Sequence, residues 1–460
     1  MDPVRVSLPR SWLLDWHRGL CYLDTKTGAA RAAKGETMLD PKFIRTNLDR
    51  VRAAIEAKGE KVNVEEYIAL DKERLAMLVE VDSLKAERNR VSEEIAGEIR
   101  SGKDPAEKKD AMRAVSKRIK EYDDKLKTVE EKLGRLILWF PNVPHLSVPV
   151  GHGEDDNKII RAWGQKPEFD FKPVPHWDIA EALDIVDFKR GTTIAASNFV
   201  VFKGLGAKLA RAVINFMLDF HTRQHGYKEI SPPVLVNRDS MTGTGQLPKL
   251  EEDMYHCGVD DLFLIPTAEV PLTNLHRDEI LDGATLPLYY TAYTPCFRRE
   301  AGSYGKDTRG LNRVHQFDKV ELVKFVEPEK SYDELEKLVG DAEEILQAFG
   351  LHYRVNLLCT GELSFSASKC YDLEAWSPGQ EKWLEVSSCS NFEDFQARRI
   401  GARYRPAPGE KARLVHTLNG SGVALPRTII AILETYQTKD GRVRVPAVLV
   451  PYMGGVEVIE

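Results

Sequence analysis

The stretch CFRREAGSYGKDTRGLNRVHQFDKVELVKF, residues 296–325, carries more information about the fold than any other part of the sequence. Two runs with strand-like alternation flank a polar, glycine-rich loop, which predicts a β-hairpin with a long connection. Alternation places Arg298 and Glu300 on one face of the first strand, and one face of the second strand carries Arg313, Phe317 and Glu321. One pleated surface would therefore present guanidinium groups, an aromatic ring and carboxylates together.

Such a surface suits a nucleotide. Guanidinium groups bind triphosphate oxygens, an aromatic ring stacks on a base, and a carboxylate binds an ammonium or hydroxyl group. Taken alone, the hairpin is equally well explained by ordinary surface ion pairs. In LEVSSCSNFEDFQARR, residues 384–399, Glu385 and Ser388 add hard oxygen ligands of the kind that Mg²⁺ prefers.

A third segment points the same way. In HTLNGSGVALPRTIIAILE, residues 416–434, Gly420 and Gly422 would allow the backbone to approach a ligand closely. Arg427 lies near the start of an apolar helix, where anions are favoured. Three such segments in this order favour a nucleotide site over three unrelated surface features.

The region 159–460 also contains an apolar helix, expected to end at Gly226 and followed by YKEISPPVLV. Its shared face consists of Leu209, Val213, Phe216, Met217 and Phe220. Taken alone, this is a core helix followed by a strand. Strands in the region are clustered rather than alternating regularly with helices, which predicts an α+β fold with a largely antiparallel sheet.

Residues 66–138 have a different pattern, that of two long helices with narrow apolar seams. The first seam consists of Met77, Val81, Leu84, Val91 and Ile95, interrupted at Arg88. The second consists of Met112, Val115, Ile119, Tyr122, Leu126, Val129, Leu133 and Leu136. With the turn sequence SGKDP at 101–105 between them, these seams predict an antiparallel coiled-coil hairpin. About 30 residues per helix would extend about 45 Å.

Charge distinguishes this hairpin from a simple spacer or dimerisation element. The segment from Lys85 to Lys120, around the tip, contains 11 basic and 7 acidic residues, whereas the root toward Leu138 is acidic. The whole chain has a net charge of −6, which argues against a protein that binds nucleic acid over its whole surface. A basic tip on an acidic protein favours contacts with nucleic-acid phosphates.

The N-terminal residues 1–37 show no sustained helical or strand period and are interpreted as an upstream extension or a consequence of start choice. An organelle presequence is the alternative, although three aspartates argue against it. From Met38 we expect a capped amphipathic helix, with Asp40 before Pro41 and the apolar residues Phe43, Ile44, Leu48, Val51 and Ile55. The Pro- and Gly-rich residues 141–158 are expected to be a linker.

Composition limits the class of protein. Hydrophobic residues make up 42% and charged residues 30% of 460 residues, which suits a globular protein of two or three domains. Because there is no apolar run of membrane-spanning length and no secretory signal, we expect a cytoplasmic protein without a membrane partner. The six cysteines lack zinc-ligand spacing and are expected to be reduced thiols: Cys21, Cys257, Cys296, Cys359, Cys370 and Cys389.

The motifs resemble those of class II aminoacyl-tRNA synthetases. The Leu209 helix with SPP resembles motif 1, FRRE with RVHQF resembles motif 2, and NGSGVALPR resembles motif 3. Together with PTAEVPL (residues 266–272) and the 384–399 segment, they resemble the bacterial-type seryl-tRNA synthetases, whose tRNA-binding arm matches the hairpin. The resemblance spans Met38 to the C-terminus. Motif 3 departs from the general class II pattern in having Pro426 where a further glycine often stands.

The resemblance implies roles for individual residues. ATP would be bound by Arg298 at the α-phosphate, by Arg313 and Arg427 at the outer phosphates, by Phe317 and Glu300 at the adenine, and also by Arg299, Val314, Glu385, Val386, Ser387 and Ser388. Glu385 and Ser388 would hold Mg²⁺, and no zinc is expected. Serine would be bound by Thr267, Ala268, Glu269, Glu321, Asn419 and Ser421. Arg298 and Arg427 are the expected catalytic residues, acting by positioning and charge neutralisation.

The function that the resemblance implies is that of a serine–tRNA ligase. It would activate L-serine with ATP to seryl-adenylate and transfer the seryl group to tRNA(Ser), and to tRNA(Sec) where the host has one. We expect a homodimer formed through motif 1. The expected domains are the extension 1–37, the tRNA-binding helical arm 38–140, the linker 141–158 and a class II catalytic domain, 159–460, built on an antiparallel sheet.

Three alternatives are less consistent with the sequence. Truncated relatives that load amino acids onto carrier proteins lack the arm that this chain has. A non-catalytic tRNA-binding paralogue should have lost phosphate-binding arginines, yet Arg298, Arg313 and Arg427 are all present. The metal-dependent form of the enzyme would need a zinc ligand set, and the sequence has no recognisable one.

Overall fold

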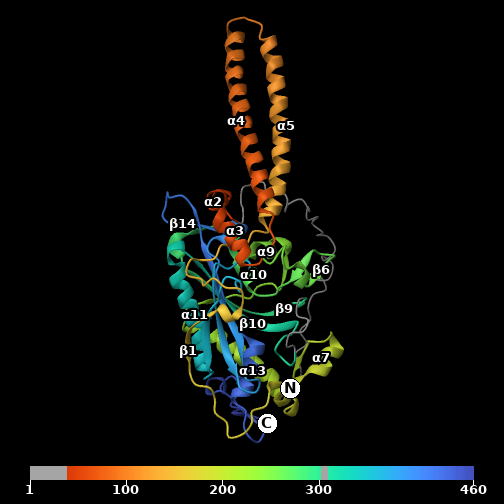
Figure 1. Cartoon of the computed structure of the whole chain (residues 1–460), viewed down its shortest axis with the longest axis vertical. Helices are drawn as coiled ribbons and strands as arrows, with labels where there is room; N and C mark the ends of the chain where they lie inside the picture. Colours follow the sequence, from red (N-terminus) through yellow and green to blue (C-terminus); the bar gives the residue numbers. More distant parts are fainter. Residues whose placement is uncertain (1–38, 302–308) are drawn as a thin grey trace, which may run out of the picture.

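The main sheet and the two-helix arm that projects from the body dominate the structure, a computed structural model (Figure 1). It describes residues 39–301 and 309–460. The predicted extension 1–37 therefore lies outside the described residues, and so do Cys21 and the centre of the long connection in the 296–325 hairpin.

Two short helices lead into the arm. α2 (Pro41–Thr46) begins at Asp40, whose carboxylate accepts a hydrogen bond from the Lys42 amide at 2.7 Å, as a helix N-cap does. The prediction of a single helix from Met38 onward is wrong. The backbone leaves helical geometry at Asn47, and a second helix, α3 (Leu48–Ala57), follows. Both helices bury apolar residues in a core that they share with the root of the arm.

The predicted coiled-coil hairpin is present and longer than expected. α4 (Val64–Arg100) has 37 residues and α5 (Ala106–Ile137) has 32. At 1.5 Å per residue, α4 spans about 55 Å rather than 45 Å. It starts before the apolar seam because Asn63 caps it, accepting a hydrogen bond from the Glu66 amide at 3.1 Å. The turn lies at 101–105, as predicted.

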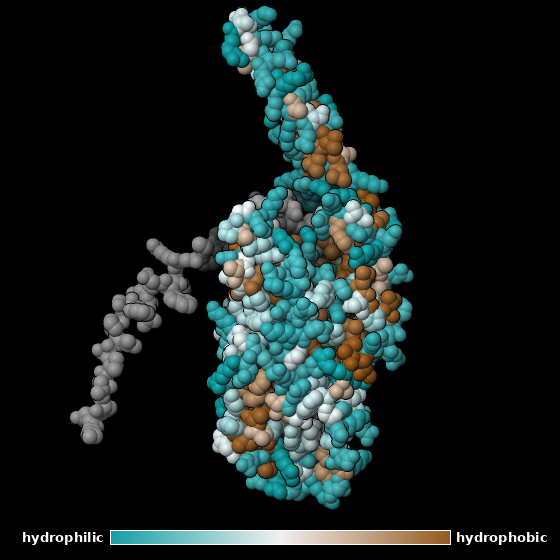
Figure 2. Space-filling model, turned by 90° about the vertical axis from the view of Figure 1, so that its left-hand side faces the viewer, coloured by the Kyte–Doolittle hydropathy of each residue, from teal (hydrophilic) through white to brown (hydrophobic). Residues whose placement is uncertain are grey.

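The seam of the arm thins toward its tip. In α4 the buried residues end at Leu84, and beyond it Val91 and Ile95 are only partly buried. Arg88, which interrupts the predicted seam, is half-buried. Figure 2 shows the consequence, an arm whose surface is mostly hydrophilic, with an apolar patch near its root. The distal half of the arm is therefore held by little apolar burial.

Eight strands form the main sheet, and all neighbouring pairs are antiparallel except β4 with β9. In spatial order the strands are β1 (Lys158–Trp163), β11 (Tyr353–Leu357), β12 (Lys369–Ser377), β13 (Lys382–Asn391), β16 (His416–Ala424), β10 (Gln316–Val326), β9 (Leu288–Phe297) and β4 (Lys228–Glu229). The α+β prediction with a largely antiparallel sheet is confirmed. β1 begins at Lys158, inside the segment predicted as linker.

Three helices pack on one face of this sheet: α8 (Gly204–Arg223), α11 (Ser331–Ala348) and α13 (Leu425–Thr435). The predicted apolar face of α8 contributes Leu209, Val213, Phe216 and Met217 to the core. The helix ends at Arg223 rather than at Gly226. The main core therefore lies between this helical layer and the sheet.

Gly420 and Gly422 face this helical layer. A Cβ atom on Gly420 would lie 2.8 Å from the Cys389 Sγ and 3.2 Å from Leu338 of α11. A Cβ atom on Gly422 would lie 2.7 Å from the His221 Nε2 of α8. The structure thus gives a packing reason for these glycines, the close approach of β16 to α8, α11 and the Cys389 side chain of β13, in addition to the predicted approach of a ligand.

The remaining elements surround the sheet. The helices are α6 (His176–Ala182), α7 (Phe188–Ile194), α9 (Arg238–Thr244), α10 (Glu269–Thr273) and α12 (Phe395–Ile400). The short strands are β2 (Val186–Asp187), β3 (Val201–Phe202), β5 (Leu235–Asn237), β6 (His256–Cys257), β7 (Leu262–Leu264), β8 (Ile280–Asp282), β14 (Arg403–Arg405), β15 (Arg413–Leu414), β17 (Val443–Arg444) and β18 (Val458–Ile459). None of the described helices is long and apolar enough to cross a membrane. All five described cysteines are free thiols, as predicted.

Candidate active site

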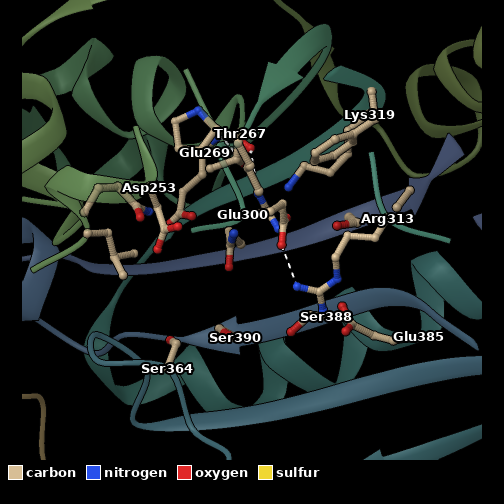
Figure 3. A pocket seen from close by; sticks show the side chains of 18 of the residues that line it. Asp253, Thr267, Glu269, Glu300, Arg313, Lys319, Ser364, Glu385, Ser388 and Ser390 are labelled. Carbon is tan, nitrogen blue, oxygen red and sulfur yellow. Dashed lines mark hydrogen bonds and ion pairs between the residues drawn. The ribbon is translucent and has the colours of Figure 1, made fainter. Parts of the chain in front are cut away.

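A pocket of about 620 Å³ lies on the face of the sheet opposite the helical layer. Strand alternation explains its position, because on β16 Asn419 and Ser421 line the pocket while the two glycines face the helices. β10 and β13 supply further side chains, namely Phe317, Lys319, Glu385, Ser388 and Ser390. Figure 3 shows many of these polar side chains converging on one space.

The junction between β9 and β10 differs from the predicted hairpin. β9 ends at Phe297, so Arg298 and Glu300 lie beyond the strand, and Glu300 has a positive φ of 53°. Arg313 likewise precedes β10. The structure nevertheless brings these side chains together, because the Arg313 Nη1 donates to the Glu300 Oε2 at 2.6 Å (Figure 3). The predicted grouping is therefore correct, but loop geometry rather than strand alternation produces it.

One end of the pocket gathers cations and an aromatic ring. The Arg298 guanidinium carbon lies 5.2 Å from the centre of the Phe317 ring. Arg427, at the start of α13, forms an ion pair with Glu385, with the Arg427 Nη1 and Glu385 Oε2 3.2 Å apart. With Arg313, three guanidinium groups line this end. Such a group can neutralise a chain of phosphates beside a stacked base.

Glu385 and Ser388 lie on one face although they are three residues apart. A β-bulge explains this, because Glu385 pairs with Glu374 and Ser387 with Leu373, which leaves Val386 as an extra residue. A carboxylate and a hydroxyl suit Mg²⁺, which proteins often hold with few carboxylates and the phosphates of a substrate. In residues 39–301 and 309–460 no group of three or more His, Cys, Asp or Glu could hold a metal.

Glu321 lies behind the other end of the pocket: it is fully buried and does not line the pocket, but three residues that line it, Thr267, Lys319 and Asn419, contact its carboxylate. Its Oε2 accepts a hydrogen bond from the Thr267 hydroxyl at 2.9 Å, and its Oε1 accepts one from the Asn419 amide at 3.0 Å. The Lys319 ammonium forms an ion pair with Oε2 at 2.5 Å. Because Glu321 is fully buried and pairs with Ser421 across β10 and β16, its position is closely defined.

Glu269, on α10, is the second carboxylate of this end. Burial and the negative charge of Glu321 raise its pKa to about 7. The Gln396 amide donates to the Glu269 Oε1 at 2.6 Å and partly opposes this increase in pKa. A carboxyl group that titrates near neutral pH in a small polar pocket is typical of a functional site.

Some predicted site residues direct their side chains elsewhere. Val386 belongs to the main core, Ala268 is fully buried, and the Ser387 hydroxyl donates to the Ser421 carbonyl at 2.6 Å. Arg299 is exposed outside the pocket lining, and its amide donates to the Asp253 carbonyl at 2.9 Å. The side chains of these four residues do not line the pocket. Val314, in contrast, lines the pocket.

Sequence reasoning missed several residues in or next to the pocket. Among them, Lys319 follows Phe317 at the strand period, so strand alternation could have identified it. Asp253 lines the pocket, and its Oδ1 accepts a hydrogen bond from the Ala301 amide at 2.7 Å. Gln396 reaches Glu269 from α12. For these last two no local sequence signal exists, because the contact depends on the tertiary fold.

Known proteins share both parts of this architecture. Residues 254–436 match the tRNA synthetase class II core domain (G, H, P, S and T), and residues 38–144 match the seryl-tRNA synthetase N-terminal domain. The serine–tRNA ligase of Geobacter sulfurreducens is 56% identical over 422 residues, which cover 92% of this chain and 100% of that protein. The chain belongs to the seryl-tRNA synthetase family.

Two further seryl-tRNA synthetases support this assignment. The serine–tRNA ligase of Caldanaerobacter subterraneus subsp. tengcongensis is 57% identical over 416 residues, which cover 90% of this chain and 98% of that protein. The crystal structure of seryl-tRNA synthetase from Pyrococcus horikoshii complexed with ATP has a TM-score of 0.86 at 39% identity, covering 92% of this chain and 99% of that one. The predicted family, class II fold and aminoacyl-tRNA ligase activity are confirmed.

Proposed function

We propose that the pocket joins L-serine to ATP, releasing pyrophosphate and forming seryl-adenylate, and then transfers the seryl group to the terminal ribose of tRNA(Ser). The observation that carries this proposal is the division of one pocket into two ends. Arginines and an aromatic ring line one end. At the other end buried Glu269 lines the pocket beside Thr267 and Asn419, the hydroxyl and amide partners of the fully buried Glu321. The first suits a nucleotide triphosphate and the second a small amino acid with an ammonium and a hydroxyl group.

At the nucleotide end, Phe317 stacks on the adenine, with Glu300 and Val314 nearby. Arg298 binds the α-phosphate, and Arg313 and Arg427 bind the outer phosphates. When Mg²⁺ is bound with ATP, held by Glu385 and Ser388, it supplies further positive charge at the phosphates. The serine carboxylate is already a nucleophile, so the arginines act by positioning it against the α-phosphate and neutralising charge as pyrophosphate leaves.

At the serine end, Glu269 and Glu321 bind the ammonium and hydroxyl groups, with Thr267, Asn419 and Ser421 around them. Ala268 contributes through its backbone. Selectivity follows from burial, because alanine would leave the hydroxyl-binding groups unpaired in a closed pocket. A site built to hydrogen-bond a hydroxyl rejects an analogue lacking it by about 10⁴-fold or more.

The arm is proposed to hold tRNA(Ser) through its basic tip, mainly by contacts with the RNA backbone and shape. Such recognition extends naturally to tRNA(Sec) in a host that has one. From the family resemblance we also propose a cytoplasmic homodimer formed through motif 1, and the domain division 38–140, 141–158 and 159–460. Light scattering of the purified chain, with a mass twice that of one chain expected, tests the dimer.

Shortening the arm tests whether its distal half binds the tRNA acceptor. Glu80 and Arg118 face each other across the hairpin at 3.1 Å, so residues 83–115 can be replaced at this level by a short Gly-Ser link. This variant keeps the buried root and should activate serine normally while losing most tRNA charging. Equal loss of both activities would mean that the distal arm is structural, and unchanged charging would mean that it does not bind the acceptor.

A further inference from the structure

Lys58, at the C-terminal end of α3, is a lysine buried where the arm root meets the catalytic body. Its side chain is inside the protein, with the residue only 9% exposed. Its ammonium group donates to three backbone carbonyls of one segment, those of Ser364 at 2.9 Å, Phe365 at 3.3 Å and Ala367 at 2.7 Å. Lys58 therefore connects two parts of the chain that are about 300 residues apart.

This segment is a wall of the active-site pocket, lined by Ser364, Phe365 and Ser366. Figure 3 shows Ser364 at the side of the pocket away from Arg313 and Glu385. The wall is also held by Asn142, just beyond the arm, whose side-chain amide donates to the Ser366 carbonyl at 2.9 Å. Contacts from both ends of the arm root thus hold the backbone of this wall.

The wall is continuous with the residues around Glu269. The Phe365 ring lies 5.8 Å from the Phe395 ring, and the Arg399 guanidinium carbon lies 5.4 Å and 4.2 Å from the centres of these two rings. Phe395 and Arg399 belong to α12, which also carries Gln396, the donor to Glu269. A shift of Phe365 would therefore act on the helix that positions a serine-binding carboxylate.

Burying the Lys58 ammonium group is energetically unfavourable, so a lysine is not expected where only a structural contact is needed. Burial lowers its pKa to about 7, because neutral carbonyls do not fully replace the lost hydration of an ammonium group. A methionine would fill similar space without this cost, but would leave the wall carbonyls without their shared donor. What lysine adds here is a defined backbone position for the wall.

We propose that Lys58 is a positioning residue for serine: by holding the 364–367 wall, it fixes Phe365 against α12 and so fixes Glu269 through Gln396. The inference rests on the proposed function. Through Lys58 the arm root contributes to the amino-acid site, whereas the distal arm does not. The arginines of the nucleotide end lie outside this chain of contacts, so ATP binding should not depend on Lys58.

The test is serine-dependent ATP–pyrophosphate exchange by full-length Lys58→Met, with Lys61→Met as the matched control because Lys61 is exposed three residues away. We expect Lys58→Met to raise the KM for serine about tenfold while the KM for ATP stays within about twofold, which is the effect of about 1.4 kcal/mol on one substrate. Lys61→Met should behave as wild type. An unchanged serine KM, or equal increases in both KM values, would overturn the proposal.

A second variant covers poor folding of Lys58→Met. Phe365→Leu keeps an apolar wall but removes the ring contacts with Phe395 and Arg399, and it should also raise the KM for serine selectively.

Hydrogen exchange adds a readout independent of activity: in Lys58→Met, amides of 364–368 and α12 should exchange faster while those of β9 and β10 do not. Uniformly faster exchange contradicts the proposal. Failure of the proposed function would appear earlier, as absence of serine-dependent exchange in the wild type.

Discussion

Arg313 and Glu300 are hydrogen-bonded to each other at 2.6 Å, although the family resemblance implies that they bind different parts of ATP. ATP would have to redirect the guanidinium group from the carboxylate to a phosphate. A hydrogen bond to a charged group contributes about 1.5–3 kcal/mol, so Arg313→Ala should raise the KM for ATP about 10–100-fold in pyrophosphate exchange. The KM for serine should change little. An unchanged KM for ATP would remove Arg313 from the nucleotide site.

The KM for serine should fall as pH rises through about 7, the value to which burial and Glu321 raise the pKa of Glu269. The ionised carboxylate attracts the serine ammonium group, so affinity should differ about tenfold between pH 6 and pH 8. In the free enzyme, the contribution of Glu269 to the free energy of unfolding changes with pH in the opposite direction. Since the folded pKa is above the unfolded one, the stabilisation from protonated Glu269 is present at low pH and is lost as pH rises to about 7.

Glu269→Gln is the control for this pH dependence. It removes the titrating group while keeping the shape of the side chain. The variant should bind serine weakly at every pH, with a flat KM profile between pH 6 and pH 8. If the steep profile persists in Glu269→Gln, another group is responsible for it.

Removing positive charge from the arm tip should weaken tRNA binding without affecting serine activation. Lys103, Lys109 and Lys117 are exposed there. Replacing all three with alanine should reduce the slope of log affinity against log salt by up to about 2–3, because each lost phosphate contact contributes about 0.7–0.9. A filter-binding titration at several salt concentrations measures this slope.

The matched control removes the same charge from the arm root, at Lys72, Lys127 and Lys132, which are also exposed. It should leave the salt slope nearly unchanged. Equal effects of the two triple variants would mean that overall charge, rather than the tip, attracts tRNA.

Gly422→Ala should destabilise the catalytic body, because the added Cβ would lie 2.7 Å from the Nε2 of buried His221. Overpacking of this kind costs about 1–3 kcal/mol, measurable by urea denaturation. Gly97→Ala in α4 is the control, since a Cβ there has no heavy atom within 4 Å. It should be neutral or stabilising by up to about 1 kcal/mol. Equal stability changes would contradict the packing explanation for β16.

Sequence periodicity predicted those features whose cause is local. The two seams of the arm are an example. Strand alternation also placed Phe317 in the pocket and Glu321 on the same side of β10, in contact with the lining residues Thr267 and Asn419. The same rule failed at Glu300, where the backbone leaves the strand. The packing role of Gly420 and Gly422 has no local signal either, because the nearest atoms come from α11, α8 and the neighbouring strand β13.

Apart from Lys319, the missed residues discussed above depend on tertiary contacts. Lys58 resembles an ordinary surface lysine at the end of a helix, and only the folded structure places it against the 364–367 carbonyls. Gln396 was missed for the same reason, since its partner Glu269 lies on another helix. The gathering of most predicted site residues in one pocket was thus predictable from motifs, whereas the contacts that position them were not.

Amino-acid-dependent exchange of pyrophosphate into ATP tests the central claim most directly. With purified full-length protein, serine should support exchange, and alanine should be less efficient by about 10⁴-fold in kcat/KM because it leaves buried polar groups unpaired. Threonine, which carries an extra methyl group, serves as a second competitor. Exchange supported by another amino acid but not by serine would contradict the claim.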